Sequence, residues 1–219
     1  MTSGLIVLNW PTPNGRKVFI MLEELGVSYE TRFVNIDRNE QFDPQFLAVS
    51  PNNKIPALID AEAEGAPIQI FESGAILIYL AEKYGRFLAR SGQARAAAQA
   101  WSFWQVGGLG PMMGQVGFFA FYAKERVPLA IERYTGEVGR LLGVLETRLA
   151  KAPYLAGDAY SIADMCIYPW VVGAYTRAKE VLAAQIADKP AISRWLEAVG
   201  SRPAVMRAMA IEPTDGITH

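Results

Sequence analysis

The chain has 219 residues, 51% of them hydrophobic and 20% charged, so it can bury a core as one large domain or two small ones. A formal net charge of −1 provides no broad positive field, which argues against nucleic acid and anionic membranes as partners. With one cysteine, Cys166, and one histidine, His219, an internal disulfide, a thiolate zinc site and histidine-based acid–base catalysis are excluded.

The N-terminal residues carry no basic segment or cleavage-like site, and no apolar stretch approaches the roughly 20 residues that span a membrane. We therefore expect a cytoplasmic protein that binds no membrane. His219 is expected to be a frayed tail residue or the start of a tag.

The first third of the chain reads as alternating strands and helices. An apolar strand at residues 5–8, a helix at 16–25 ended by Gly26, and a strand at 29–36 form a βαβ unit. A short helix at 44–49 follows, then strands at 57–60 and 68–71 joined by a hairpin, and an apolar helix at 74–84 closed by Gly85. This order is that of a thioredoxin-like domain.

From about residue 86 the strand pattern disappears. Segments 94–121, 129–149, 161–175 and 191–199 each have apolar residues at a helical period. The fold class is therefore α/β plus all-α, with an N-terminal thioredoxin-like domain at 1–86 and a C-terminal helical bundle at 93–219. The boundary is expected within residues 87–92.

Three places in the first domain carry candidate chemistry. Glu72 and Ser73 at a predicted helix start offer a carboxylate for an amine, and a hydroxyl with exposed backbone N–H groups for a carboxylate. Lys54, in a turn beside Ile55-Pro56, offers an ammonium for a second carboxylate, and Pro56 is a candidate for a cis bond. The structural alternatives are that Ser73 is only an N-cap, and that Lys54 is solvated beside an ordinary loop proline.

Thr12 and Asn14 lie between the first predicted strand and helix. A helix N-terminus supplies positive potential, and the hydroxyl or amide can donate to a sulfur, so a thiol bound there would ionise more readily. The alternative is plain N-capping by Thr12 or Asn14 with Pro13 at the helix start.

Other features favour structural roles. Gly108 and Gly110 have neither the preceding strand nor the Gly-Lys-Ser/Thr sequence of a phosphate-binding loop, so they are predicted to let Pro111 kink a helix or let another backbone approach. Residues 161–164 (SIAD) fit a helix capping box, and Cys166 on the same helix is predicted to be a buried, inert thiol.

Taken together, residues 12–18 (TPNGRKV), 50–57 (SPNNKIPA) and 71–76 (FESGAI) closely resemble the nu-class bacterial glutathione transferases. The likeness continues through residues 104–112 (WQVGGLGPM), 130–134 (AIERY) and 154–164, and so covers nearly the whole chain. The fold it implies is the glutathione transferase fold.

The resemblance implies a homodimer that binds glutathione or glutathione disulfide, and the single cysteine and single histidine lead us to expect no metal. It implies that Thr12 and Asn14 serve the sulfur, and that the tripeptide contacts the residues Gln41, Lys54, Ile55, Glu72 and Ser73. Members of the class are similar in binding two glutathione molecules, or one disulfide, per site and in reducing disulfides, and Arg133 matches an arginine at the second molecule. The activity implied is glutathione transfer with glutathione-dependent disulfide reduction.

The chain departs from the class after Gly114-Gln115, where it continues VGFFAFY through residue 122 in place of polar residues. This predicts a more apolar acceptor side and leaves open an aromatic electrophile or ether as co-substrate. Two further alternatives stay open: a glutathione-binding regulatory protein with little turnover, and a scaffold whose helical half is a docking surface. The sequence does not identify the physiological co-substrate.

Overall fold

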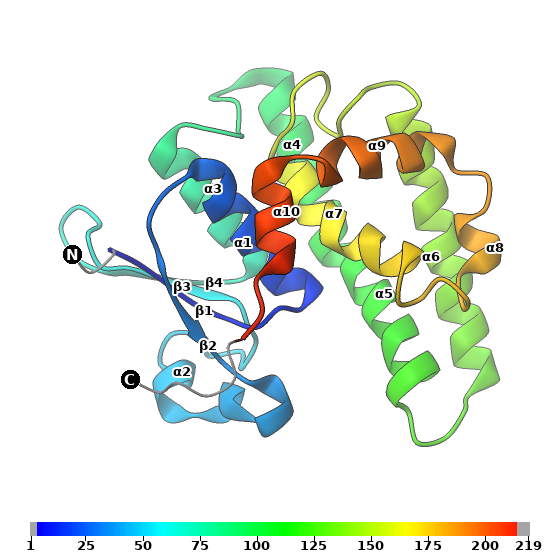
Figure 1. Ribbon diagram of the computed structural model, residues 1–219, viewed down its shortest axis with the longest axis horizontal. Helices are drawn as coiled ribbons and strands as arrows, with labels where there is room; N and C mark the ends of the chain where they lie inside the picture. Colours follow the sequence, from blue (N-terminus) through cyan, green and yellow to red (C-terminus); the bar gives the residue numbers. More distant parts are fainter. Residues whose placement is uncertain (1–3, 214–219) are drawn as a thin grey trace. The chain divides into compact units, whose positions relative to one another are not determined.

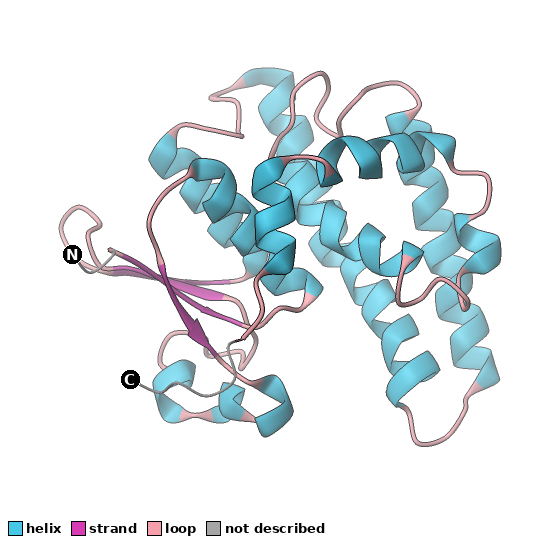
Figure 2. Ribbon diagram, viewed as in Figure 1, coloured by secondary structure: helices cyan, strands magenta, loops and turns pink. Residues whose placement is uncertain are grey.

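The computed structural model describes residues 4–213, so His219 lies outside the described residues. The described chain packs as two compact units (Figure 1): residues up to Arg86 with those from Arg202 onward, and Phe87–Ser201. The α/β-plus-all-α class is confirmed, because all named strands lie in the first unit and the second is helical (Figure 2). The domain limits 1–86 and 93–219 stay predictions.

The first unit is built on one four-stranded sheet of order β2-β1-β3-β4. Its strands are β1 (Leu5–Asn9), β2 (Glu30–Phe33), β3 (Ala57–Asp60) and β4 (Ile68–Phe71). β1 runs parallel to β2 and antiparallel to β3, so Val7 lies opposite both Thr31 and Leu58. The sequence placed β3 and β4 at their observed bounds, while β2 is shorter than predicted.

Helices cover both faces of this sheet (Figure 1). One face carries α1 (Pro13–Leu25), α3 (Ser73–Tyr84) and α10 (Pro203–Ala210), with α3 and α10 both packed against α1. On the other face, α2 (Pro44–Leu47) follows the short turns η1 (Ile36–Arg38) and η2 (Glu40–Phe42). There, Phe46 of α2 packs with Leu8 and Val34 in a small apolar cluster.

The start of α1 is fixed by close contacts with the end of β1. Asn9 is fully buried, and its side-chain amide donates to the Gly15 carbonyl at 3.0 Å. A Cβ atom on Gly15 would lie 1.9 Å from the Trp10 carbonyl oxygen, a distance at which atoms overlap. Only glycine therefore allows α1 to begin this close to β1, which holds Asn14 at the end of the sheet.

The helix α10 was not predicted from the sequence. Arg16 of α1 is nearly buried and donates to the carbonyls of Ala208, at 2.9 Å, and Ile211, so a guanidinium caps the C-terminal end of α10. Farther along α1, Arg202 donates to Glu24 at 2.9 Å. The two helices are thus joined by polar contacts at both ends.

The second unit contains one long helical run and four shorter segments. Predicted segment 94–121 corresponds to α4 (Gly92–Trp104), the π-helical turn η3 (Gln105–Leu109), α5 (Gly110–Gly117) and the π-helical turn η4 (Phe118–Tyr122). It is followed by α6 (Pro128–Leu149), α7 (Ile162–Tyr175), α8 (Ala183–Ile186) and α9 (Pro190–Gly200). The turn η3 precedes Pro111, which has no N–H to continue the regular α-helical pattern.

Two structural predictions for this unit are confirmed. Ser161 and Asp164 form the capping box at the start of α7, and buried Asp164 also accepts from the indole N–H of Trp195 at 2.9 Å. Cys166 is fully buried, and its thiol donates to Oε1 of Gln105 at 3.1 Å. Among the described helices, none is both long and apolar enough to cross a membrane.

Candidate glutathione site

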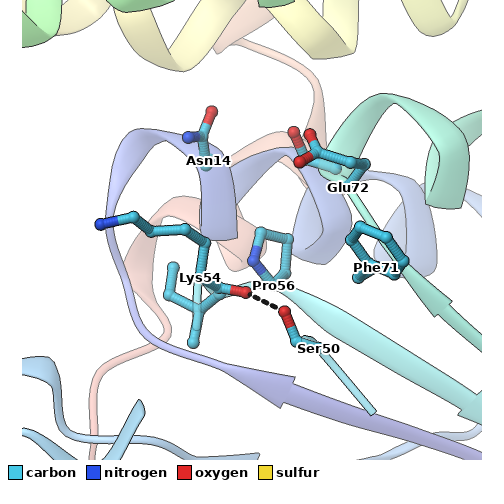
Figure 3. Close-up of a pocket in the computed structure, with 8 residues that line it drawn as sticks. Asn14, Ser50, Lys54, Pro56, Phe71 and Glu72 are labelled. Atoms are coloured by element: carbon cyan, nitrogen blue, oxygen red, sulfur yellow. Dashed lines mark hydrogen bonds between the residues drawn. The ribbon is translucent and has the colours of Figure 1, made fainter. Parts of the chain in front are cut away.

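A cleft of about 140 Å³ lies in the first unit where three segments meet (Figure 3). They are the start of α1, the loop before β3, and the junction of β4 with α3. Its lining residues are Asn14, Ser50, Lys54, Ile55, Pro56, Phe71, Glu72 and Ser73. The fold therefore brings five of the eight predicted site residues into one cleft.

The β4–α3 junction differs from the predicted cap. Glu72, not Ser73, occupies the N-cap position, and no side-chain hydrogen bond caps the helix there. The suggestion that Ser73 is only an N-cap is therefore wrong, because Ser73 is the first residue of α3. Its hydroxyl and the first N–H groups of α3 stay available to an anion, since the first helical hydrogen bond is from Ile76 to the Glu72 carbonyl.

Glu72 has an unusual backbone conformation, with φ 74° and ψ 115°. A positive φ is uncommon outside glycine and typically costs about 1–3 kcal/mol, so it persists only where the surrounding structure enforces it. The consequence here is an exposed Glu72 carboxylate at the cleft while Ser73, the next residue, is buried.

Lys54 lies on the other side of the cleft from Glu72 in Figure 3, with Asn14 and Pro56 between them. The Ile55–Pro56 peptide bond is cis, as predicted, and the Ser50 hydroxyl donates to the Lys54 carbonyl at 2.8 Å. This bond ties the loop to the turn after α2. The cleft thus presents a cation and an anion on separate walls.

A further residue in contact with the cleft lining, Lys17, was missed by sequence reasoning. Lys17 is fully buried in α1, and its ammonium donates to the Ser73 hydroxyl at 3.2 Å. In the sequence Lys17 belongs to the TPNGRKV segment, but nothing in that segment distinguishes a buried lysine from an exposed one.

The remaining predicted residues lie elsewhere. Thr12 caps α1, accepting from the Gly15 N–H at 3.2 Å, and its role at the sulfur stays a prediction. Gln41 lies in η2, where its side-chain oxygen is buried with no hydrogen-bond partner among the described residues. Neither lines the cleft. Arg133 is on α6 in the second unit, and its role stays a prediction.

The apolar segment that follows Gln115 exposes several aromatic rings in the second unit. Phe118, Phe121 and Tyr122 are between 41% and 61% exposed. The Arg177 guanidinium lies 5.6 Å from the ring centre of Phe121 and 5.0 Å from that of Tyr122, as in cation–π contacts. This segment therefore exposes aromatic rings, two of which lie against the cationic side chain of Arg177.

No group of three or more His, Cys, Asp or Glu side chains within residues 4–213 is arranged to hold a metal ion. The cleft itself presents two ionised side chains, a hydroxyl, an amide and the N-terminal turns of α1 and α3.

Two segments of the chain match the two domains of one known protein family. The model of the glutathione S-transferase N-terminal domain matches residues 3–82, and that of the C-terminal domain matches residues 110–203. The chain belongs to the glutathione S-transferase family. The cleft lies entirely within the glutathione S-transferase N-terminal domain.

Relatives within the glutathione S-transferase family include disulfide-bond oxidoreductase YfcG of Escherichia coli K12, 49% identical over 201 residues, or 91% of each chain. A Burkholderia graminis glutathione transferase, solved with two glutathione molecules per subunit, is 46% identical with a TM-score of 0.91 over 97% of this chain and 89% of that one. A Pseudomonas putida transferase, solved with one glutathione disulfide per subunit, is 42% identical with a TM-score of 0.89 over 94% and 91% of the two chains.

Proposed function

We propose that this protein is a glutathione-dependent enzyme of the nu class that uses the bound glutathione thiolate to reduce disulfides or attack electrophiles. The observation that carries this proposal is the charge arrangement of the cleft. Glu72 suits the γ-glutamyl amine, Ser73 with the α3 N-terminus suits the γ-glutamyl carboxylate, and Lys54 suits the glycyl carboxylate. These are the three ionised groups of the tripeptide.

The position of the thiol follows from the same placement. A tripeptide held at both ends places its cysteine between Lys54 and Glu72, which is where Asn14 lies in Figure 3. Asn14 stands in the first turn of α1, whose positive end favours the thiolate over the thiol. Main-chain atoms of Ile55 precede β3 and are suited to pairing with the extended peptide.

Disulfide reduction is favoured by the relatives. The bound thiolate attacks one sulfur of the substrate disulfide and releases the other as a thiol, leaving a mixed disulfide with glutathione. A second glutathione thiolate then attacks that bond, releasing the reduced substrate and glutathione disulfide. Related transferases have been solved with two glutathione molecules or with glutathione disulfide, which are the reactant and the product of these two steps. We propose Arg133 as a contact for the second glutathione molecule.

A second candidate is conjugation of glutathione to an aromatic electrophile or ether. The exposed rings of Phe118, Phe121 and Tyr122, which replace the polar residues of the class, favour it. The two activities use the same thiolate and differ in the acceptor. A regulatory protein that binds glutathione with little turnover is the alternative, and a glutathione complex inactive toward every disulfide and electrophile would support it.

The assignment is tested by replacing each charge of the cleft. Glu72→Ala and Lys54→Ala are each expected to weaken glutathione binding about tenfold or more, because each removes a charge-assisted contact. Calorimetric titration and half-saturation for glutathione are the measurements. Glu82→Ala, on the same helix but outside the cleft, is the control. Unchanged affinity in both cleft variants would remove the proposed site.

We also propose a cytoplasmic homodimer, as the resemblance implies. Sedimentation equilibrium is expected to give twice the chain mass of 24.1 kDa over the micromolar range. A monomer at every concentration would contradict this proposal without affecting the site.

A further inference from the structure

The buried lysine beneath the cleft is the starting point. A lysine is rarely buried completely, because removing its ammonium from water is costly unless polar partners compensate. Lys17 is nevertheless 0% exposed, and its ammonium reaches the hydroxyl of Ser73, which is 5% exposed and lines the cleft. The contact joins α1 to the first residue of α3.

This contact fixes the direction of the Ser73 proton. An ammonium group has three donors and no acceptor, so the serine oxygen must accept from Lys17. The single hydroxyl proton is then directed elsewhere and can be donated to a ligand in the cleft. A serine without such a neighbour could instead turn its proton away from an incoming anion.

The same contact adds positive charge where α3 already contributes some. The first N–H groups of α3 point out of the helix at Ser73, at the positive end of the helix dipole. The ammonium of Lys17 contacts the side chain of the same Ser73, in buried surroundings where charges are screened less than at the surface. An anion at Ser73 would be stabilised by both.

We propose that Lys17 is a positioning residue for the γ-glutamyl carboxylate, holding Ser73 as a donor and supplying a buried charge that selects a ligand with a free carboxylate at this end. The inference rests on the proposed function and deepens it. Lys17 acts through Ser73 and does not touch the tripeptide. Lys54 would recognise the other carboxylate, so the two lysines divide the two ends of the ligand.

This division can be measured with three ligands. They are glutathione, its analogue with γ-aminobutyrate in place of the γ-glutamyl residue, which lacks only that carboxylate, and glutathione with a glycyl carboxamide. Lys17→Met should bind glutathione about 10- to 100-fold more weakly than the parent protein, the effect of losing a charged hydrogen-bonded group. It should bind the γ-aminobutyryl analogue within about twofold of the parent.

Lys54→Met is the matched control, since it removes the same charge from the opposite wall of the cleft. It should lose affinity for glutathione and for the γ-aminobutyryl analogue by the same factor, and show no loss for the carboxamide. Ser73→Ala should reproduce the ligand pattern of Lys17→Met. The double variant with Lys17→Met and Ser73→Ala should bind glutathione about as weakly as either single variant, because both substitutions remove the same contact.

Far-UV circular dichroism and thermal unfolding establish that each variant is folded. If Lys17→Met does not fold, Lys17→Gln removes the charge with a shorter side chain and should show the same ligand pattern. Lys17→Arg keeps the charge and should retain the preference for glutathione over the γ-aminobutyryl analogue. Equal losses for all three ligands, or none, would overturn the inference and make Lys17 a packing residue. If the parent protein itself fails to bind glutathione, the proposed function fails first.

Discussion

At the scale of single residues, Thr12 and Asn14 have different positions although they are two residues apart. The Thr12 oxygen accepts the Gly15 N–H as a helix cap, so only its proton is left to donate to a sulfur. Asn14 lines the cleft and Thr12 does not. If Thr12 contacts the sulfur, it does so while also serving as the N-cap of α1.

Thr12→Ala and Asn14→Ala are both expected to raise the thiol pKa of bound glutathione and lower turnover, each pKa unit corresponding to about 1.4 kcal/mol. Thr12→Ala should also lower the free energy of unfolding by about 0.5–2 kcal/mol, since it removes a cap. Thiolate absorbance against pH and chemical denaturation measure the two effects. Thr12→Ser, which keeps the hydroxyl, is the control. If both alanine variants leave thiol pKa and rate unchanged, another group activates the sulfur.

At the scale of elements, the orientation of α3 matters because its first residues form one wall of the cleft. Asp60 at the end of β3 is fully buried and accepts from the Tyr79 hydroxyl at 2.6 Å, and it pairs with Lys83 one turn further along α3. Burial favours the neutral acid, but the hydrogen bonds from Lys83 and Tyr79 outweigh it, so the pKa of Asp60 is lowered. Burial and the bond to Asp60 raise the pKa of Tyr79 to about 12.

A lowered folded-state pKa means that Asp60 stabilises the fold above its ordinary value of 3.8, and that this contribution is lost as the pH falls through the folded-state pKa. Asp60→Asn should therefore cost about 1–3 kcal/mol of unfolding free energy at pH 7 and have less effect in acid. Urea denaturation from pH 7 down into acid measures the cost at pH 7 and its decrease at low pH. Glu30→Gln breaks an exposed pair with Arg32 and should change stability by less than about 1 kcal/mol. An equal cost of Asp60→Asn at every pH would contradict the linkage.

At the scale of the whole molecule, the thiols that the protein itself provides decide how it can reduce a disulfide. Cys166 is the sole cysteine of the sequence, and it is buried against Gln105 within the second unit. A buried thiol cannot attack a substrate disulfide, because attack requires an accessible thiolate. Both reducing equivalents must then come from glutathione.

Cys166→Ser is accordingly expected to retain most disulfide-reductase activity, since a serine hydroxyl can donate to Gln105 as the thiol does. Reduction of a model disulfide, coupled to glutathione reductase, measures it, and unfolding curves show whether α7 still packs. A folded Cys166→Ser protein that binds glutathione but has no reductase activity would make Cys166 the nucleophile and move the protein toward cysteine-dependent relatives.

Much of the fold and part of the site could be predicted from local patterns. The bounds of β3 and β4, the left-handed Gly26 and Gly85 that end α1 and α3, and the Ser161–Asp164 capping box depend on residues within about one helical turn or one strand of each other. The resemblance in turn named five residues that the fold gathers in one cleft. The strand bounds, the helix-ending glycines and the capping box could be predicted because each depends on residues close together in the sequence.

Only the tertiary structure decided which groups stand behind that cleft. Lys17 and Ser73 are 56 residues apart, and Arg16 reaches a carbonyl 192 residues away on a helix that was not predicted. Whether a lysine is buried depends on which elements pack over it, and no periodicity within α1 records that. The sequence by itself determined the elements and the chemistry of their ends, while the path of the chain determined that a buried ammonium lies beneath Ser73.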